Sequence, residues 1–302
     1  MKYLIVLTST EAKKFIAKSL VRKNGAMKKA LKEGIVLLHP STSTVFIYEE
    51  LVGKIPEGLC FVGAIAPKAT CISREFEEVA AQRKEGFDQR DATFSWAFKK
   101  GEFIKGVPLG ECLNEMGPGD LYVKGVNTID PNGNAGVLTA NPDGGTITRA
   151  MSYARQKRFG ILLIATSNKL INTSIEEASK ATGRDKLDGA MGIPTSLFKV
   201  DGSLVTEKEA FQWHGIKATS ISGGGLCEAE GAFVYVLEGN EGAIKACLEL
   251  IGECKGARLE TAFPDCEVCR YKRCNLSTVN QGISKGVMEI ETLVTYLKSQ
   301  KW

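Results

Sequence analysis

Short apolar runs recur along this chain, and each is followed by a stretch with helical periodicity. The runs Tyr3 to Leu7, Ile35 to Leu38 and Ile161 to Ala165 contain only four or five residues. That length suits a buried strand and is too short for a core helix or a membrane span. Continuous apolar strands are typical of parallel sheets, because such sheets are covered on both faces. The alternation therefore predicts an α/β fold.

Helical patterns fill the segments between these runs. One begins at Ser9 or Thr10 as N-cap and continues to Arg22, and a second covers residues 27–33 and ends at Gly34. We expect further helices at 46–51, 75–84, 147–157, 172–181, 207–213, 241–254 and 286–297, and extended segments at 59–72, 94–104, 121–123, 218–221, 232–237 and 257–262. The pattern predicts a mostly parallel, Rossmann-like sheet with helices on both faces.

The last third of the chain differs from the rest. A glycine turn at 223–225 precedes a strand, a helix and a further extended segment. We therefore predict a Rossmann-like domain over residues 1–225 and a small α+β subdomain over residues 226–302, which carries a cysteine cluster and the C-terminal helix.

Composition excludes several classes of partner. The formal net charge of the 302 residues is +4, from 39 basic and 35 acidic side chains spread along the chain. A nucleic-acid binder concentrates its basic residues on one face, so we expect no nucleic-acid partner. The chain has neither a signal-peptide pattern nor an apolar run of about 18 residues. We therefore expect a cytoplasmic protein with no membrane partner, and we expect it to form a homo-oligomer.

A hydroxyl turn, made of Ser41, Thr42, Ser43 and Thr44, lies between a predicted strand and a predicted helix. Hydroxyl groups and unpaired N–H groups at a helix N-terminus suit a phosphate or a carboxylate. The alternative is simple capping of the helix. His39 ends the preceding strand, where an open α/β sheet places its ligand-binding groups. We predict that these residues contact a ligand.

The segment 127–146 is rich in Asn, Asp and Gly, and it is long for a loop in a compact domain. Loops of this length are often functional. Asn127 and Asp130 are candidate hydrogen-bonding partners for a polar ligand. Gly144, Gly145 and Thr146 precede a predicted helix and form a second candidate anion contact, with Arg149 as the nearest cation. The alternative is a set of structural Asx turns.

The glycine turn at 223–225 is followed closely by Glu228 and Glu230. These acids alternate along an extended segment, so both can face the same way. We predict ligand contacts from Gly224 and Glu228. The alternative is a tight turn before a strand, with both acids in solvent.

Three of the nine cysteines form a C-x2-C-x4-C run, at Cys266, Cys269 and Cys274. A C-x2-C pair places two thiolates around one metal ion, and zinc or an Fe–S cluster is the usual occupant. No fourth ligand is evident, and Cys254 or Cys227 would have to fold back to supply it. Plain reduced thiols in a tight turn, or a redox-active pair, are the alternatives.

Two segments together resemble the ribose-5-phosphate isomerase superfamily, which includes glucosamine-6-phosphate deaminase and CoA transferases. Residues 30–51 read ALKEGIVLLHPSTSTVFIYEEL, and residues 120–134 read DLYVKGVNTIDPNGN. In the isomerases the first is a helix, a strand and a Gly-Thr-Gly-Ser-Thr loop that holds the sugar phosphate. The second carries Asp-Gly-Ala-Asp-Glu-x-Asp. The order and spacing agree over residues 25–172, and the resemblance implies the superfamily fold.

The departures from the isomerase pattern fall on its catalytic groups. Only Gly125 and Asp130 of the acidic motif are kept, while Lys124, Asn127 and Thr128 replace its other acids. An isomerase that moves a proton between carbons needs a carboxylate base. No glutamate occurs between residues 115 and 176, and no lysine occurs between residues 124 and 157. We therefore expect no ribose-5-phosphate isomerase activity.

The leading hypothesis is a protein that binds a small anionic or phosphorylated metabolite in a cleft at the carboxyl edge of the sheet. It requires that the hydroxyl turn and the 127–146 segment meet at that edge. One alternative is an acyl- or CoA-transferring enzyme that uses Glu228 or Glu230 as nucleophile. Another is a non-enzymatic metal- or redox-sensing regulatory protein built on the cysteine cluster.

Overall fold

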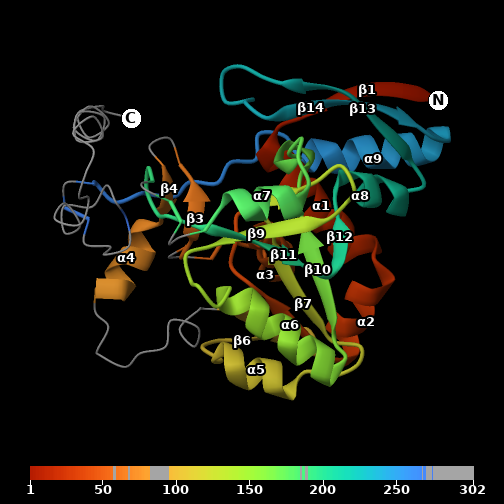
Figure 1. Ribbon diagram of the computed structural model, residues 1–302. Helices are drawn as coiled ribbons and strands as arrows, with labels where there is room; N and C mark the ends of the chain where they lie inside the picture. The colour runs from red at the N-terminus through yellow and green to blue at the C-terminus, as the bar shows by residue number, and fades with distance from the viewer. Residues whose placement is uncertain are drawn as a thin grey trace.

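A mixed six-stranded sheet forms the centre of the protein in the computed structural model (Figure 1). The structure describes residues 1–56, 59–66, 69–81, 95–183, 186–187, 190–266, 268–269 and 274. The helix expected at 286–297 lies outside these residues. The strand order is β12-β10-β7-β2-β5-β6. The strands are β2 (Ile35–Leu38), β5 (Trp96–Lys99), β6 (Glu102–Ile104), β7 (Leu121–Gly125), β10 (Gly160–Ile164) and β12 (Ser203–Val205).

Strands β2, β7, β10 and β12 run parallel, and β5 and β6 add an antiparallel hairpin at one edge. Lys100 and Gly101 turn this hairpin with positive φ angles of 50° and 84°. Two central residues with positive φ give a turn whose twist matches that of the strands. These two residues divide the extended segment expected at 94–104 into the two strands of the hairpin.

Helices cover both faces of this sheet. The described helices of the protein are α1 (Ser9–Lys23), α2 (Gly25–Glu33), α3 (Thr44–Val52), α4 (Arg74–Ala81), α5 (Leu109–Glu115), α6 (Gly145–Lys157), α7 (Ile175–Ala181), α8 (Glu207–Trp213) and α9 (Glu241–Cys254), with a short 3-10 helix η1 (Ser167–Lys169). All four residues of β2 are buried. Val36 and Leu38 join the cluster of α1 and α3, whereas Ile35 and Leu37 join that of α5 and α6. Within the described residues the helices expected from periodicity form, although α1 is capped by Thr8 rather than by Ser9 or Thr10.

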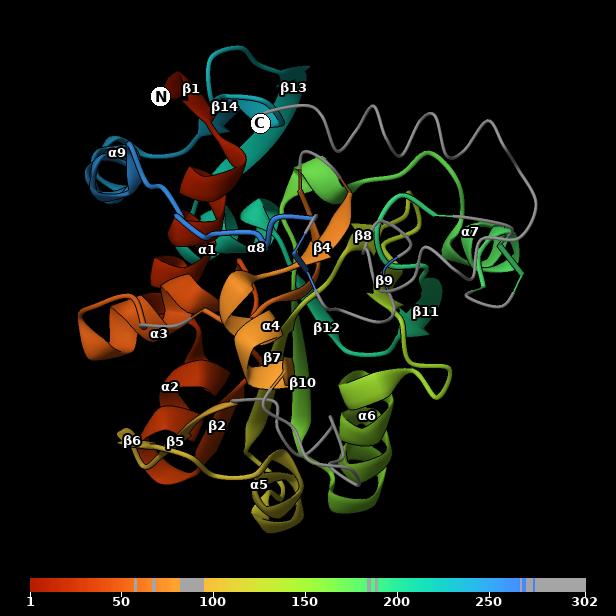
Figure 2. The same cartoon turned by 90° about the vertical axis from the view of Figure 1, so that its left-hand side faces the viewer.

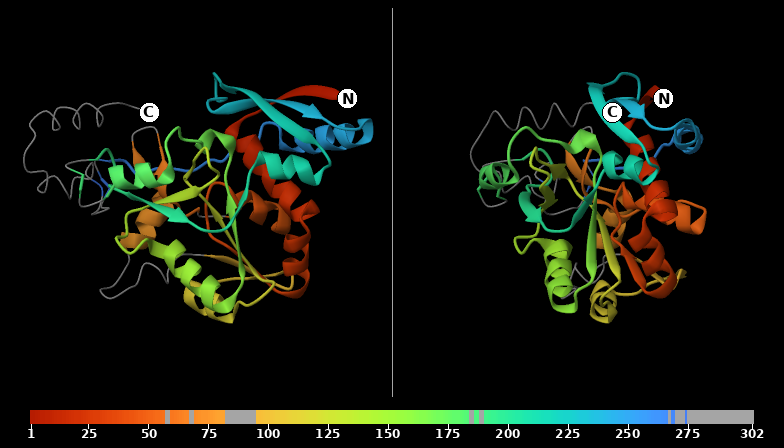
Figure 3. Two further views of the ribbon diagram at one scale, coloured as in Figure 1. Left: turned by 45° about the vertical axis from the view of Figure 1, so that its right-hand side comes forward. Right: turned by 90° about the vertical axis from the view of Figure 1, so that its right-hand side faces the viewer.

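A separate antiparallel sheet joins the two halves of the chain (Figure 3). It has the order β1-β14-β13, from β1 (Lys2–Leu7), β14 (Ala232–Glu238) and β13 (Lys217–Gly224). The expectation of a buried first strand is wrong, because β1 is an edge strand in which only Ile5 and Leu7 are buried. The pairing of β1 with β14 crosses the predicted boundary at residue 225. Residues 257–262 form no strand.

The segment 127–146 is not an open loop. It contains β8 (Thr128–Ile129) and β9 (Ala135–Thr139), which form a three-stranded antiparallel sheet with β11 (Ser196–Val200). A two-stranded sheet of β3 (Val62–Ile65) and β4 (Thr70–Ile72) lies beside the hydroxyl turn. Antiparallel pairs thus outnumber parallel pairs in the described residues, which confirms a mixed α/β protein but not a mostly parallel one. None of the described helices has the length and apolarity that a membrane crossing demands.

Candidate functional site

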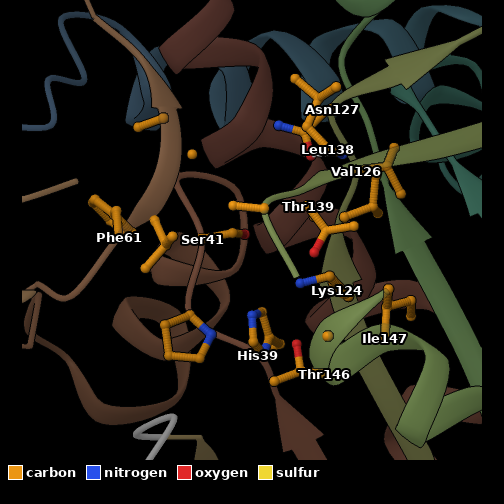
Figure 4. Close-up of a pocket in the computed structure, with 18 of the residues that line it drawn as sticks. His39, Ser41, Phe61, Lys124, Val126, Asn127, Leu138, Thr139, Thr146 and Ile147 are labelled. Carbon is orange, nitrogen blue, oxygen red and sulfur yellow. Dashed lines mark hydrogen bonds between the residues drawn. The ribbon is translucent and has the colours of Figure 1, made fainter. Parts of the chain in front are cut away.

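A pocket of about 220 Å³ opens at the carboxyl ends of β2 and β7. The hydroxyl turn and the 127–146 segment meet there, together with β3 and the start of α6 (Figure 4). Seven of the residues predicted from the sequence line this pocket: His39, Ser41, Thr42, Asn127, Gly144, Gly145 and Thr146. The juxtaposition that the leading hypothesis requires is therefore present.

Gly125 allows the hydroxyl turn to approach β7. A Cβ atom at this position would lie 2.5 Å from Ser41 Oγ and 3.0 Å from Ser41 Cβ. A larger residue at this position would force the Ser41 side chain to move, so glycine at the end of β7 allows the close approach of the turn. The His39 N–H donates to the Val123 carbonyl at 2.8 Å and continues the pairing of the two strands up to the turn.

The two helix N-termini at the pocket differ. At α3, Ser41 Oγ accepts hydrogen bonds from the N–H groups of Ser43 and Thr44, at 3.3 and 3.1 Å. The hydroxyl turn therefore caps its own helix. At α6, the N-cap is Gly144 with φ of 79°, which has no side chain that could accept from the first N–H groups. This 13-residue helix offers its positive end to the pocket through Gly145 and Thr146.

Two lysines that the sequence analysis did not select also line the pocket. Lys124, on β7, is only 7% exposed, and burial lowers the pKa of its ammonium group to about 7. Lys169 follows β10 and is half-buried as a residue, but its ammonium group is enclosed and donates to the Val126 carbonyl. The pKa of Lys169 is lowered to about 7, chiefly by burial and also by the charges of Lys13 and Lys124, while the charge of Glu207 acts in the opposite direction. Neither lysine forms an ion pair with any described residue.

His39 lies next to Lys124 in the pocket (Figure 4). Burial lowers its pKa well below the usual value, and the charge of Lys124 lowers it further, so the imidazole is neutral. Its Nδ1 atom is buried and has no hydrogen-bond partner among the described residues. A buried polar atom without a partner is costly, which makes this nitrogen a ready contact for a ligand group.

The other predicted contacts lie outside the pocket lining. Ser43 and Thr44, the last two residues of the hydroxyl turn, are buried. Asp130 braces its own loop, because its carboxylate accepts from the N–H groups of Asn132, Asn134 and Ile175. These three carboxylate contacts agree with the Asx-turn alternative. Arg149 has interactions of its own and is not among the lining residues.

The glycine turn is also remote from the pocket lining. Gly224 ends β13, and Glu228 forms an exposed ion pair with Arg258. Strand β13 belongs to the separate sheet of β1, β14 and β13, and the predicted contacts from Gly224 and Glu228 are not brought to the pocket.

The three candidate metal ligands come together in a smaller cluster beside β4 and α4. Cys269 and Cys274 are buried there, and Cys266 packs against them. All nine cysteines are described, and none forms a disulfide. Within the described part of the chain, no three Cys, His, Asp or Glu side chains are arranged as a bound metal ion requires. Cys254 lies in the large core cluster and Cys227 is exposed, so neither belongs to the smaller cluster that contains the run.

The chemistry of the pocket follows from its cations. An ammonium group with a pKa near 7 exists in both forms at neutral pH, so it can bind an anion when charged and act as a base or nucleophile when neutral. The sequence signal for Lys124 was a charged residue directly after the apolar run of β7, since buried charges without partners concentrate at functional sites.

Comparison of the chain with protein-family models, curated proteins and solved structures found no match.

Proposed function

We propose that the protein binds a small anionic or phosphorylated metabolite in the pocket at the carboxyl edge of the six-stranded sheet. One observation carries the proposal: Lys124 and Lys169 bring two enclosed ammonium groups to the same space as the open N-terminus of α6. Enclosed like charges are unfavourable unless an opposite charge joins them. A doubly charged phosphate would neutralise both ammonium groups and a carboxylate would neutralise one, and either anion would accept hydrogen bonds from the helix N–H groups.

The size of the pocket narrows the ligand class. Its volume of about 220 Å³ is below the roughly 300–1,000 Å³ of pockets that hold drug-sized ligands. A sugar phosphate or a short carboxylate fits this space better than a dinucleotide or a whole CoA molecule. The neutral His39 and the hydroxyls of Ser41, Thr42 and Thr146 would contact the uncharged part of the ligand.

The position also supports the resemblance to the ribose-5-phosphate isomerase superfamily, which stays a prediction. Open α/β sheets of the Rossmann-like kind bind ligands outside the carboxyl ends of their parallel strands. The pocket occupies that place on β2 and β7. Lys124 stands where the isomerases carry an acid. We therefore expect this protein to bind the same class of ligand as the isomerases but not to catalyse their reaction.

The test is calorimetric titration of the protein with inorganic phosphate, ribose 5-phosphate and a short dicarboxylate. We expect at least one of these anions to bind. A bound anion raises the pKa of both ammonium groups, so above pH 7 the protein should take up about one proton per lysine when the anion binds. Comparing the heats in buffers with different ionisation enthalpies measures this uptake. The affinity should fall as the pH rises from 7 to 9.

Lys124→Met should abolish binding, while Lys199→Met, which removes an exposed lysine on β11, should leave it unchanged. Binding that is independent of pH, or equal in the two variants, would refute the proposal. So would the absence of any heat or melting shift with all three anions.

A further inference from the structure

His39 and Lys124 are neighbours on two parallel strands of the six-stranded sheet. Strands β2 and β7 pair with Leu37 opposite Tyr122, and the hydrogen bond from the His39 N–H to the β7 backbone continues this pairing. Two residues further on, the same register places His39 opposite Lys124. Side chains alternate between the faces of a strand, so both lie on the face of Leu37 and Tyr122, and the rings of His39 and Tyr122 are 6.4 Å apart between centroids. Helix α6 covers this face, and α1 and α3 cover the other (Figure 2).

The two pocket lysines differ in what their ammonium groups contact. Lys169 Nζ donates to the Val126 carbonyl, which fixes it beside the backbone. Among the described residues, the ammonium group of Lys124 has neither a hydrogen bond nor an ion pair, and Figure 4 shows it directed into the pocket. Lys169 is therefore placed to hold a charged group, whereas the nitrogen of Lys124 is accessible for a reaction.

The surroundings of Lys124 favour an amine that reacts as a nucleophile. Several apolar side chains line the pocket with it: Phe61, Val126, Leu138, Ile147 and Ile193. Apolar surroundings favour the neutral amine, whose lone pair attacks carbonyl carbons. The neighbouring His39 has a buried Nδ1 atom without a hydrogen-bond partner among the described residues, so its imidazole is available to carry a proton.

We propose that Lys124 forms a Schiff base with the aldehyde or ketone group of a small phosphorylated or carboxylated metabolite, and that His39 carries the proton. The inference rests on the proposed anion site, because Lys169 and the start of α6 would hold the charged end of the metabolite. The same pocket then brings the carbonyl carbon to the nitrogen of Lys124. Binding at the charged end thereby becomes a means of positioning the reacting group.

The reaction consumes one carbonyl group and releases one water molecule. The ammonium group of Lys124 passes a proton to the imidazole of His39, and the nitrogen lone pair forms a bond to the carbonyl carbon. The carbonyl oxygen takes a second proton from the same nitrogen and then the proton held by His39, and it leaves as water while the C=N bond forms. The resulting iminium ion has the same single positive charge as the ammonium group, so the bound anion stays paired.

The test incubates the whole chain with dihydroxyacetone phosphate or with pyruvate, in the presence of cyanoborohydride, which reduces a Schiff base to a stable secondary amine. With at least one of these ketones, mass spectrometry should show a chain heavier by the ketone less one oxygen atom. Peptide mapping should place the added mass on Lys124. The matched alcohols, glycerol 3-phosphate and lactate, should leave the mass of the chain unchanged.

Three variants sharpen the assignment. Lys124→Arg keeps a positive charge but cannot form the iminium ion, so it should give no adduct. Lys199→Met removes an exposed lysine on β11 and should react like the wild type. His39→Gln should form the adduct roughly a hundredfold more slowly or worse, which is the usual loss when a general acid–base group is removed. An unchanged rate in His39→Gln would remove His39 from the proposal.

Peptide mapping of the wild-type chain gives the answer even if a variant does not fold. The Schiff base is overturned if neither ketone gives an adduct, if the adduct lies on Lys169, or if exposed lysines such as Lys199 are modified as much as Lys124. Calorimetry with glycerol 3-phosphate keeps the two proposals apart. Binding of this alcohol without any ketone adduct would refute the Schiff base alone, whereas absence of binding by every anion would refute the anion site.

Discussion

Lysines in two regions of the molecule meet opposite electrostatic conditions. On the outer face of α1, Lys18 Nζ lies 3.0 Å from Glu50 and 2.9 Å from Glu253, and Arg22 bonds the same two carboxylates. We call this four-residue group the surface network. In the pocket, Lys124 and Lys169 have no such carboxylate partner among the described residues.

The pKa shifts have opposite signs for this reason. Burial lowers the pKa of Lys18, but the hydrogen bonds that Lys18 donates to Glu253 and Glu50 outweigh burial and raise the pKa. Burial acts almost alone on Lys124 and lowers its pKa to about 7. The comparison shows that the surface network is satisfied by the fold itself, whereas the pocket lysines are held in an unfavourable state that a ligand would relieve.

The largest effect should come from Lys124→Met, which removes an enclosed charge and keeps most of the apolar side chain. We expect the free energy of unfolding at pH 6–7 to rise by roughly 2–5 kcal/mol, because the ionised group is destabilising in the folded state. Denaturant unfolding of the ligand-free protein measures this. An unchanged or lower stability of the variant would mean that Lys124 has an unrecognised partner.

The pH dependence of this difference has a definite sign. The folded-state pKa of Lys124 is about 7 and its ordinary value is 10.5, so the unfolded chain binds more protons between these two values. Wild-type stability should therefore rise with pH across that range, and the advantage of Lys124→Met should shrink as it does. The exposed control Lys199→Met should follow the wild-type curve.

An intermediate effect is expected at the contact that shapes the pocket. Gly125→Ala places a Cβ against Ser41 and should lower the free energy of unfolding by roughly 1–3 kcal/mol. Gly252→Ala in α9 is the matched control, because nothing lies within 4 Å of its new Cβ, and it should be neutral or stabilising. Adding Ser41→Gly to Gly125→Ala should recover part of the loss; a strictly additive double variant would exclude the steric explanation.

The smallest effect belongs to the surface network. Hydrogen bonds from Arg22 and Lys18 lower the pKa of Glu253 to about 2, so its contribution is present above its ordinary value of 4.5 and is lost as the pH falls toward 2. Glu253 is 45% exposed, so solvent screening limits the loss in Glu253→Gln to under about 1 kcal/mol at pH 7. The loss should shrink further at high salt. If Glu253→Gln lowers the free energy of unfolding as much as Gly125→Ala does, the surface network contributes as much to stability as the contact that shapes the pocket.

Features that depend on neighbouring residues could be predicted from the sequence, and features that depend on distant contacts could not. Helix α2 ends at Gly34 and α9 covers Glu241–Cys254, as expected from the sequence, because periodicity, caps and stop signals act over a few neighbouring residues. The hydroxyl turn and the start of α6 were found for the same reason. Asp130 was assigned to the ligand because an Asx turn and a ligand contact use the same residue types.

The sequence by itself determined the helices, the apolar strands and the two polar segments that follow strands, since these depend on local pattern. Only the tertiary structure decided that β1 pairs with β14 and that Lys124 and Lys169 share one pocket. Each of these depends on contacts between segments far apart in the chain. The energy of such contacts comes from burial and charge in the packed state, which no local pattern encodes.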